Sequence, residues 1–131
     1  MRKGGLPAAL AVAALLALAG AARAQEQLDP RIAAYDKGAA TIDVSKYPPE
    51  MQSRYKVFAA KCMKCHTLAR PINCDFVLEE EWERYVKRMM RKPGSGINAA
   101  DGKEIFEFLA YDSKTRKKAL YERKLQEGGK P

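Results

Sequence analysis

The chain has 131 residues, a formal net charge of +8 and three cysteines. This length supports one small domain and excludes an architecture of several domains. No segment after residue 24 is apolar enough over about 18 positions to cross a bilayer, which excludes a membrane span in the rest of the chain.

Residues 1–24 are predicted to be a cleaved signal peptide. They begin with Arg2 and Lys3, continue with an apolar run over 6–20, and end in Ala22-Arg23-Ala24, the small-x-small pattern of a cleavage site. The apolar run is short for the alternative, a retained membrane anchor, which needs about 18 residues or more. Cleavage after Ala24 would place the mature chain in the periplasm or otherwise outside the cytoplasm. It removes three bases and lowers the net charge from +8 to +5.

The residues after the signal divide into a leader, a folded domain and a tail. Residues 25–49 show no sustained periodicity and end in Tyr47-Pro48-Pro49, which predicts an extended leader that lies across the domain or is partly disordered. The folded domain is expected over residues 50–111. Residues 112–131 are mostly charged and are predicted to form a basic helical tail.

About three helices are predicted in the folded domain, and strand-like alternation is absent, so the fold class is all-α. The first begins at Pro49-Glu50, where proline and an acid suit a first turn. The second spans 79–92, with acids early and bases late, and Pro93-Gly94-Ser95-Gly96 ends it. The third has Asn98 as its N-cap. Their apolar faces hold, in turn, Met51, Tyr55, Phe58, Ala59 and Cys62; Trp82, Tyr85, Val86 and Met89; and Ile105, Phe106, Phe108 and Leu109.

The first helix leads into Cys62-Met63-Lys64-Cys65-His66, and Cys-x-x-Cys-His is typical of covalent haem c attachment. Two thiols at this spacing can each add to one of the two vinyl groups of a haem and form thioether bonds. The adjacent histidine is then held next to the iron and donates a ring nitrogen to it. The motif predicts one covalent haem, attached through Cys62 and Cys65, with His66 as the proximal iron ligand.

Three other interpretations of the motif are weaker. A structural zinc site needs four ligands, and only Cys74 could join the motif's two cysteines and one histidine. A thioredoxin-like Cys-x-x-Cys belongs to a βαβ pattern, which is absent. A disulfide leaves His66 without a role. With the other two cysteines on haem, Cys74 is a buried small residue, a partner for another chain, or an exposed thiol.

The second axial ligand of the iron cannot be a histidine of this chain, because His66 is the only one. Methionine is the remaining soft neutral ligand and pairs with histidine in cytochromes c. Met63 lies inside the attachment loop, where its side chain is not expected to reach the opposite face of the haem. Met51, at the start of the first helix, is more simply a core residue. Met89, at the centre of an apolar stripe, is predicted as the distal ligand, with Met90 as the alternative; otherwise Met89 is a core residue.

The order of these features resembles the small class I cytochrome c family over residues 49–111. The shared features are an N-terminal helix, the attachment motif, Trp82 and Met89, a Pro-Gly turn and an aromatic C-terminal helix. The chain is similar to bacterial cytochromes in which a tryptophan precedes a hydrophobic pair and then methionine. It also resembles, less specifically, the haem domains of reaction-centre cytochromes c-551.

This resemblance implies thioethers at Cys62 and Cys65 and iron ligation by His66 and Met89. It implies that the carbonyl of Pro71 accepts the ring N–H of the proximal histidine. It also implies that the first and last helices cross. Their contact would involve Phe58 or Tyr55 of the first helix and Phe106 and Leu109 of the last.

The implied function is that of an exported monohaem c-type cytochrome, which shuttles single electrons and catalyses no reaction. A fixed subunit of a larger membrane redox complex would differ only in its partners. A haem peroxidase or gas-binding sensor would need an open iron position. We expect redox partner proteins that are acidic or membrane-bound, and no nucleic acid.

The basic residues indicate where a partner would bind. Residues 112–131 contain seven bases and three acids, which account for +4 of the mature +5. Either these bases only keep a terminal helix soluble, or they steer the protein onto an acidic partner or an anionic membrane surface. In the second case, four bases of the second helix contribute to the steering: Lys87, Arg88, Arg91 and Lys92.

Overall fold

The structure, a computed structural model, describes residues 28–128, and its regular elements are all helices. They are α2 (Pro30–Asp36), α3 (Pro49–Cys62), α4 (Ala69–Asn73), α5 (Glu79–Met90), α6 (Ala99–Thr115) and α7 (Lys118–Gly128). The all-α fold class is confirmed for these residues, with six helices where about three and a helical tail were expected. None of the six is long and apolar enough to cross a bilayer. The predicted signal peptide lies outside the described residues.

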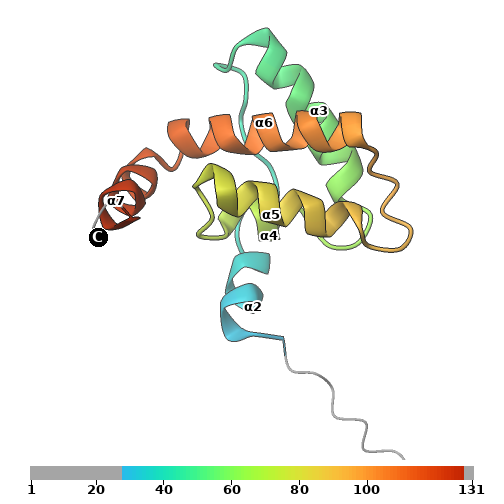
Figure 1. Cartoon of the computed structure of the whole chain (residues 1–131), viewed down its shortest axis with the longest axis horizontal. Coiled ribbons are helices and arrows are strands. Elements are labelled where there is room, and N and C mark those ends of the chain that lie inside the picture. Colours follow the sequence, from blue (N-terminus) through green and yellow to red (C-terminus); the bar gives the residue numbers. More distant parts are fainter. Residues whose placement is uncertain (1–27, 129–131) are drawn as a thin grey trace, which may run out of the picture.

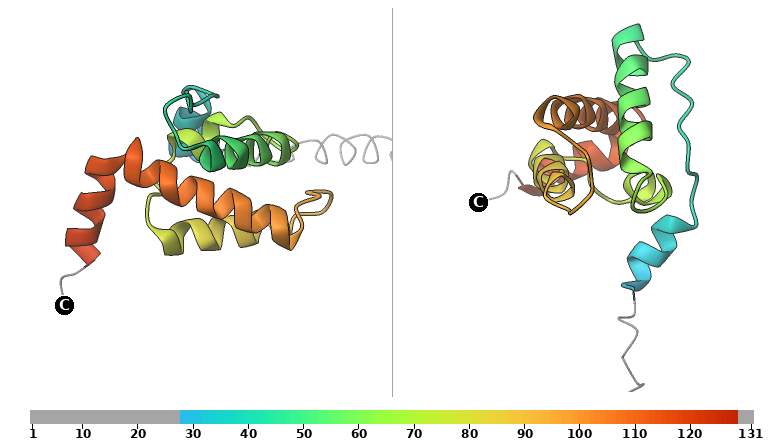
Figure 2. Two further views of the ribbon diagram at one scale, coloured as in Figure 1. Left: turned by 90° about the horizontal axis from the view of Figure 1, so that it is seen from above. Right: turned by 90° about the vertical axis from the view of Figure 1, so that its right-hand side faces the viewer.

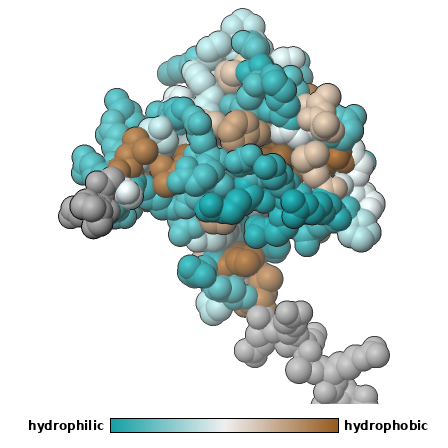
Figure 3. All heavy atoms as spheres, viewed as in Figure 1, coloured by the Kyte–Doolittle hydropathy of each residue, from teal (hydrophilic) through white to brown (hydrophobic). Residues whose placement is uncertain are grey.

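Three long helices form the body of the molecule. Helix α3 crosses α6, while α5 lies alongside α6 (Figure 1). Helix α7 turns away from the end of α6, as the views in Figure 2 show. Hydrophilic side chains cover most of the face in Figure 3, including the region over α5, so the apolar sides of α5 and α6 are turned inward.

Local signals in the sequence fix the beginnings of the long helices. Pro49 and Glu50 open α3 as predicted. Before α5, the Glu81 carboxylate accepts hydrogen bonds from the backbone N–H groups of residues 77 and 78, both at 2.9 Å. At α6, the Asn98 side chain accepts from the Asp101 N–H at 2.8 Å, and the Asp101 carboxylate accepts from the Asn98 N–H at 3.2 Å. These bonds satisfy N–H groups that have no partner inside a helix.

The core forms where α3 crosses α6. The rings of Phe58 and Phe108 stack with centroids 5.4 Å apart, and Tyr55 lies 5.3 Å from Phe108. Both phenylalanines are fully buried, and burying a side chain of this size stabilises a fold by about 1.5–3 kcal/mol. The helix crossing implied by the resemblance is therefore present. Its aromatic residue on α6 is Phe108, whereas Phe106 is only partly buried.

Helix α6 carries the core beyond residue 111, where the folded domain was expected to end. The indole N–H of Trp82 donates to the Ser113 hydroxyl at 2.8 Å, and that hydroxyl donates to the Leu109 carbonyl at 2.8 Å. Asp112 and Ser113 are buried. The first residues assigned to the tail thus belong to the packed interior, because they continue the inner face of α6.

The leader contains a helix that the sequence analysis did not predict. The Asp29 side chain accepts from the Arg31 N–H at 2.9 Å, and Pro30 begins α2. Residues 37–48 are not helical and run beside α3 (Figure 2, right). There the Tyr55 hydroxyl accepts from the Ile42 N–H at 3.2 Å. The prediction of a leader without helix is wrong for residues 30–36, since an N-cap and proline start a short helix there.

Helix α4 also replaces part of an expected loop. Its Arg70 forms a bidentate ion pair with Asp36 of α2, at 3.0 and 2.6 Å. The Asn73 amide donates to the carbonyls of Tyr35 and Ala39 at 3.2 and 2.9 Å. Pro71 is tolerated because it lies in the first helical turn, where its missing N–H would have no helical partner. Contacts with the leader therefore hold this five-residue helix.

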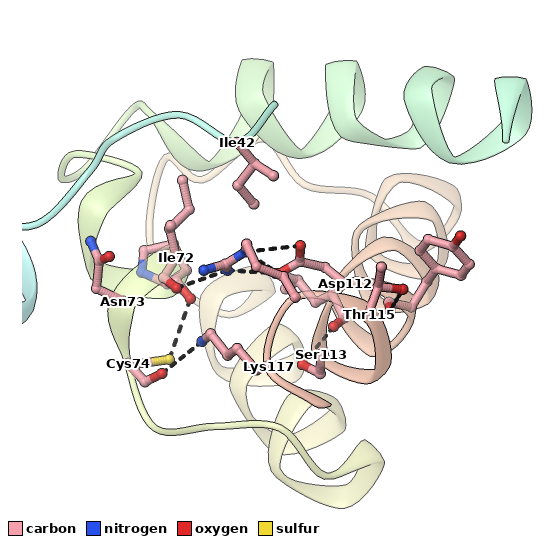
Figure 4. A network of polar contacts seen from close by, with 12 residues as sticks. Ile42, Ile72, Asn73, Cys74, Asp112, Ser113, Thr115 and Lys117 are labelled. Atoms are coloured by element: carbon pink, nitrogen blue, oxygen red, sulfur yellow. Dashed lines mark hydrogen bonds and ion pairs between the residues drawn. The ribbon is translucent and has the colours of Figure 1, made fainter. Parts of the chain in front are cut away.

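Basic side chains that follow the end of α6 bind the other side of the same segment, as Lys117 does in Figure 4. The Arg116 guanidinium donates to the Ile72 carbonyl at 3.0 Å and pairs with buried Asp112 at 2.7 Å. The Lys117 ammonium donates to the Cys74 carbonyl at 2.7 Å, and burial lowers the pKa of this lysine. Lys124 donates to the carbonyl of residue 75 at 2.6 Å. The tail is thus bound to the domain.

Candidate functional site

The attachment motif follows the end of α3 directly, as predicted. Cys62 is the last residue of the helix and is buried, whereas Cys65 is exposed in the turn that follows. Met63 is exposed, with 62 % of its surface accessible. Helix α3 thereby fixes the position of the Cys62 thiol, and the turn that follows it holds the Cys65 thiol and His66 nearby.

The ring of His66 contacts the backbone next to it. Its Nδ1 lies 3.0 Å from the Thr67 carbonyl oxygen. With the proton on Nδ1, the ring donates to that carbonyl, and Nε2 keeps its lone pair for a metal. The Pro71 carbonyl, which the resemblance implied as the partner, instead accepts from the Cys74 thiol at 3.4 Å. Helix α4 accounts for this difference, because it turns Pro71 toward the following residues.

One cavity joins the motif to α5. Tyr85 and Met89 lie one helical turn apart on α5 and share a face. The turn over residues 92–97 closes a further side. The complete lining consists of Lys61, Cys62, Cys65, His66, Tyr85, Met89, Lys92, Ser95 and Ile97. The structure thus brings Met89 to the same cavity as both thiols and the histidine of the motif.

Met90, the alternative to Met89, lies elsewhere. It lines a groove between α5 and α6 with Val86 and Phe106. Its sulfur packs so closely on Gly102 that a Cβ placed there would lie 2.6 Å away. Successive residues of a helix point in directions about 100° apart, so only one of the two methionines can face the motif.

The cavity is narrow, and a glycine-rich turn forms one wall. Its enclosed volume is about 20 Å³, enough for about one water molecule. Gly94 and Gly96 in the adjoining turn have φ of 74° and 62°, values that favour glycine. A macrocycle would need this turn and α5 to lie further from the attachment loop than they do here.

Tyr85 was predicted only as an apolar residue of the second helix, and its hydroxyl was not predicted to belong to the site. Only 6 % of its surface is exposed, and its hydroxyl has no hydrogen-bond partner among residues 28–128. Burial, with a contribution from the Cys62 thiol, raises the pKa of this tyrosine. A buried hydroxyl without a partner is costly, by about 1–3 kcal/mol, so it marks a place where an acceptor is missing. The sequence indicated this polar group only in that a tyrosine, and not a phenylalanine, occupies the middle of an apolar stripe.

Cys74 lies apart from the motif. It is buried and lines a different cleft with Tyr35 and Arg70. Within residues 28–128, no three His, Cys, Asp or Glu side chains are grouped to hold a metal ion. The zinc interpretation therefore lacks its fourth ligand in this arrangement. The burial of Cys74 agrees with its interpretation as a buried small residue.

The residues of the cavity fit a covalent haem by their chemistry. Two thiols, an imidazole with a free nitrogen and a thioether are the groups that haem c uses for attachment and iron ligation. The unpartnered Tyr85 hydroxyl could donate to one of the carboxylates that form the polar part of a haem. Burial raises the pKa of the Cys62 thiol to about 12, so this thiol is neutral at physiological pH in the folded chain. Attachment of a haem to this thiol would therefore be easier before the chain closes around it.

The number of reactive thiols provides a direct test. If the motif carries a covalent haem, only Cys74 should remain free, and it should resist iodoacetamide because it is buried and its pKa is raised by burial. Mass spectrometry should find no alkyl group on the native protein and one after unfolding. Two or more alkyl groups after unfolding would contradict attachment through both cysteines of the motif.

No family model matches the chain, and no curated protein or solved structure shows significant similarity to it. The resemblance to class I cytochromes c consequently rests on the motif and on the order of elements around it. Function has to be inferred from the cavity itself.

Proposed function

We propose that the exported chain is a monohaem c-type cytochrome that carries single electrons between redox partners. One observation supports this most directly. Cys62, Cys65, His66 and Met89 line a single cavity, although they come from a helix end, a turn and a second helix. Methionine is not part of the attachment motif, so its presence in this cavity is independent support.

Each residue would have a distinct role. Cys62 and Cys65 would hold the haem, each by addition of its S–H across one vinyl double bond, so that sulfur would bond to one carbon and the proton would go to the neighbouring carbon. His66 offers Nε2 to the iron while Nδ1–H donates to the Thr67 carbonyl. Met89, which lines the same cavity from α5, would offer its thioether sulfur as the second ligand. The bound haem supplies a one-electron Fe(II)/Fe(III) couple.

The surroundings favour electron transfer over catalysis. His66 and Met89 would supply the two protein ligands of the iron, and a histidine–methionine pair raises the reduction potential. Among the described residues, no carboxylate and no second histidine lines the cavity, and these are the side chains that most often serve as general acid or base. A function as peroxidase or gas sensor has less support for these reasons.

The experiment that tests this proposal combines mass and absorption spectroscopy of the exported protein. The intact mass should equal the chain from Gln25 plus one haem, and the haem should remain on the protein through acid–acetone extraction. The reduced protein should show the sharp visible bands of a six-coordinate c-type haem. A mass of the chain alone, or of the chain plus zinc, would refute the proposal.

The sign of one stability change tests whether the Tyr85 hydroxyl gains a partner in the haem protein. If it donates to a haem carboxylate, Tyr85→Phe should lower the free energy of unfolding by about 1.5–3 kcal/mol, the range for hydrogen bonds to charged groups. If the hydroxyl stays unpaired, the same change should be neutral or stabilising. Denaturant unfolding of both haem proteins, followed by circular dichroism, separates the two outcomes.

A further inference from the structure

Tyr85 borders two hollows of the molecule. One is the cavity next to the attachment motif, and the other is the cleft that Cys74 lines. The volume of this cleft is about 250 Å³, close to the lower end of the range for small-molecule sites, about 300–1,000 Å³. Its walls come from α2, from the segment that follows α4, and from α5. The cleft can therefore hold a small organic molecule, and the proposed electron transfer makes no use of it.

Aromatic side chains form much of the wall of this cleft. Tyr35 of α2 and Phe76, which precedes α5, are both partly buried and pack against the core. The centre of the Phe76 ring lies 6.0 Å from that of Tyr85, and the two planes are 72° apart. Ile32 adds an aliphatic surface. Walls made of rings favour a ligand with a planar apolar body, because such a body can pack on their faces and edges.

Three arginines and two acids line the same cleft. Arg31 pairs with Asp29 at 3.2 Å. Arg70 pairs with Asp36 at 2.6 Å. Arg88 is exposed and forms no ion pair within residues 28–128. The cleft therefore has one guanidinium whose charge no carboxylate of the described chain balances.

The unbalanced guanidinium lies next to the unpartnered hydroxyl. Arg88 and Tyr85 are three residues apart on α5 and share a face, and the Arg88 guanidinium lies 5.6 Å from the centre of the Tyr85 ring. The remaining acid of the cleft, Asp75, forms no ion pair within residues 28–128. Burial and the nearby Asp75 carboxylate raise the pKa of Tyr35, which places this acid beside that tyrosine. Both unsatisfied groups on α5 are hydrogen-bond donors, so the missing partner is an acceptor, and a carboxylate has an oxygen for each.

We propose that this cleft binds a small organic anion that has a planar apolar body and one carboxylate. The carboxylate accepts hydrogen bonds from the Arg88 guanidinium and from the Tyr85 hydroxyl, and the body packs on Phe76 and Tyr35. A hydroxyl has only one hydrogen to donate. While the anion is bound, Tyr85 therefore cannot donate to the haem carboxylate considered above.

Benzoate and benzylamine, which share a ring and differ in the sign of their charge, test the class of ligand. Isothermal titration calorimetry of the purified protein should show one site for benzoate, with a dissociation constant of about 0.1–1 mM, as expected for so small a ligand. Benzylamine should bind at least about tenfold more weakly. Inorganic phosphate should also bind more weakly, since it cannot use the aromatic walls. Binding of either probe as tightly as benzoate would overturn the proposal.

Three variants of α5 test the two donors. Arg88→Gln and Tyr85→Phe should each weaken benzoate binding about tenfold, because each removes a hydrogen bond to a charged group. Arg84→Gln makes the same change in net charge as Arg88→Gln, at an exposed residue of α5 that does not line the cleft. It should change the dissociation constant by less than about twofold. Equal effects of the two arginine variants, or unaltered affinity in Tyr85→Phe, would overturn the proposal.

The failure of this inference can be distinguished from the failure of the proposed function, because the titration does not depend on electron transfer. A haem protein that binds no benzoate would overturn the anion site and leave the cytochrome proposal intact. A chain that binds benzoate through Arg88 and Tyr85 but carries no haem would support the anion site and refute the cytochrome.

Discussion

Replacing both Cys62 and Cys65 by alanine should abolish the stable haem binding that we propose for this chain. These are the two thiols of the cavity, and without them no thioether can form. Haem that remained after acid–acetone extraction should fall from one per chain to essentially none. Intact mass and the absorption of the extracted protein measure this directly.

Cys74→Ala is the matched control for the loss of a thiol. Cys74 is buried in a different cleft, so this variant should keep one haem per chain with an unchanged spectrum. Haem that survives extraction in the double variant would refute covalent attachment through the motif. Loss of haem in the Cys74 variant would assign that cysteine a role that its position does not suggest.

Met89→Ala should open one coordination position of the iron. The oxidised protein should lose the weak methionine-to-iron band in the far red, and the iron should bind cyanide and carbon monoxide. The reduction potential should fall on the order of 0.1 V, out of the roughly 0.8 V that axial ligands span. Absorption spectra and a redox titration check these changes.

Met90→Leu is the corresponding control, because it changes a methionine on the same helix that packs on Gly102 away from the cavity. A swap that conserves volume should cost less than about 1.5 kcal/mol and leave the spectrum unchanged. If Met90→Leu removes the far-red band and Met89→Ala does not, the ligand assignment is wrong. Rapid carbon monoxide binding by the unmodified reduced protein would favour an open iron, as in a sensor or peroxidase.

Local sequence signals predicted the long helices well and the short ones poorly. Helices α3, α5 and α6 begin where a proline, a carboxylate and an asparagine cap were expected. Helix α2 carried comparable signals in Asp29 and Pro30, but seven residues are too few to show an apolar period. Helix α4 is shorter still, and isolated helices of this length are not stable. It exists because Arg70 and Asn73 bind the leader, a contact that no local pattern reveals.

The candidate site was predictable where chemistry depends on spacing along the chain. The motif gave Cys62, Cys65 and His66, and helical periodicity placed Met89 on an inner face. Burial was harder to predict. Lys117 was interpreted as a surface base, yet it lies over the Trp82 ring at 5.7 Å and donates to a backbone carbonyl. A lysine can bury its long stem and still bond its charge, so its type alone does not reveal its surroundings.

The leader and the segment after α6 both contact α4, which links them to His66, the proposed iron ligand. Arg70 and Asn73 bind the leader, while Arg116 and Lys117 bind the carbonyls at the other side of the same short helix. Only Thr67 and Leu68 separate α4 from His66, and Thr67 supplies the carbonyl that faces the ring. Segments joined in this way tend to open together as one cooperative unit. Cleavage by a protease within the leader or the tail would therefore remove part of what orients His66. If the chain carries haem, as proposed, the absorption spectrum of the cleaved protein would differ from that of the intact protein.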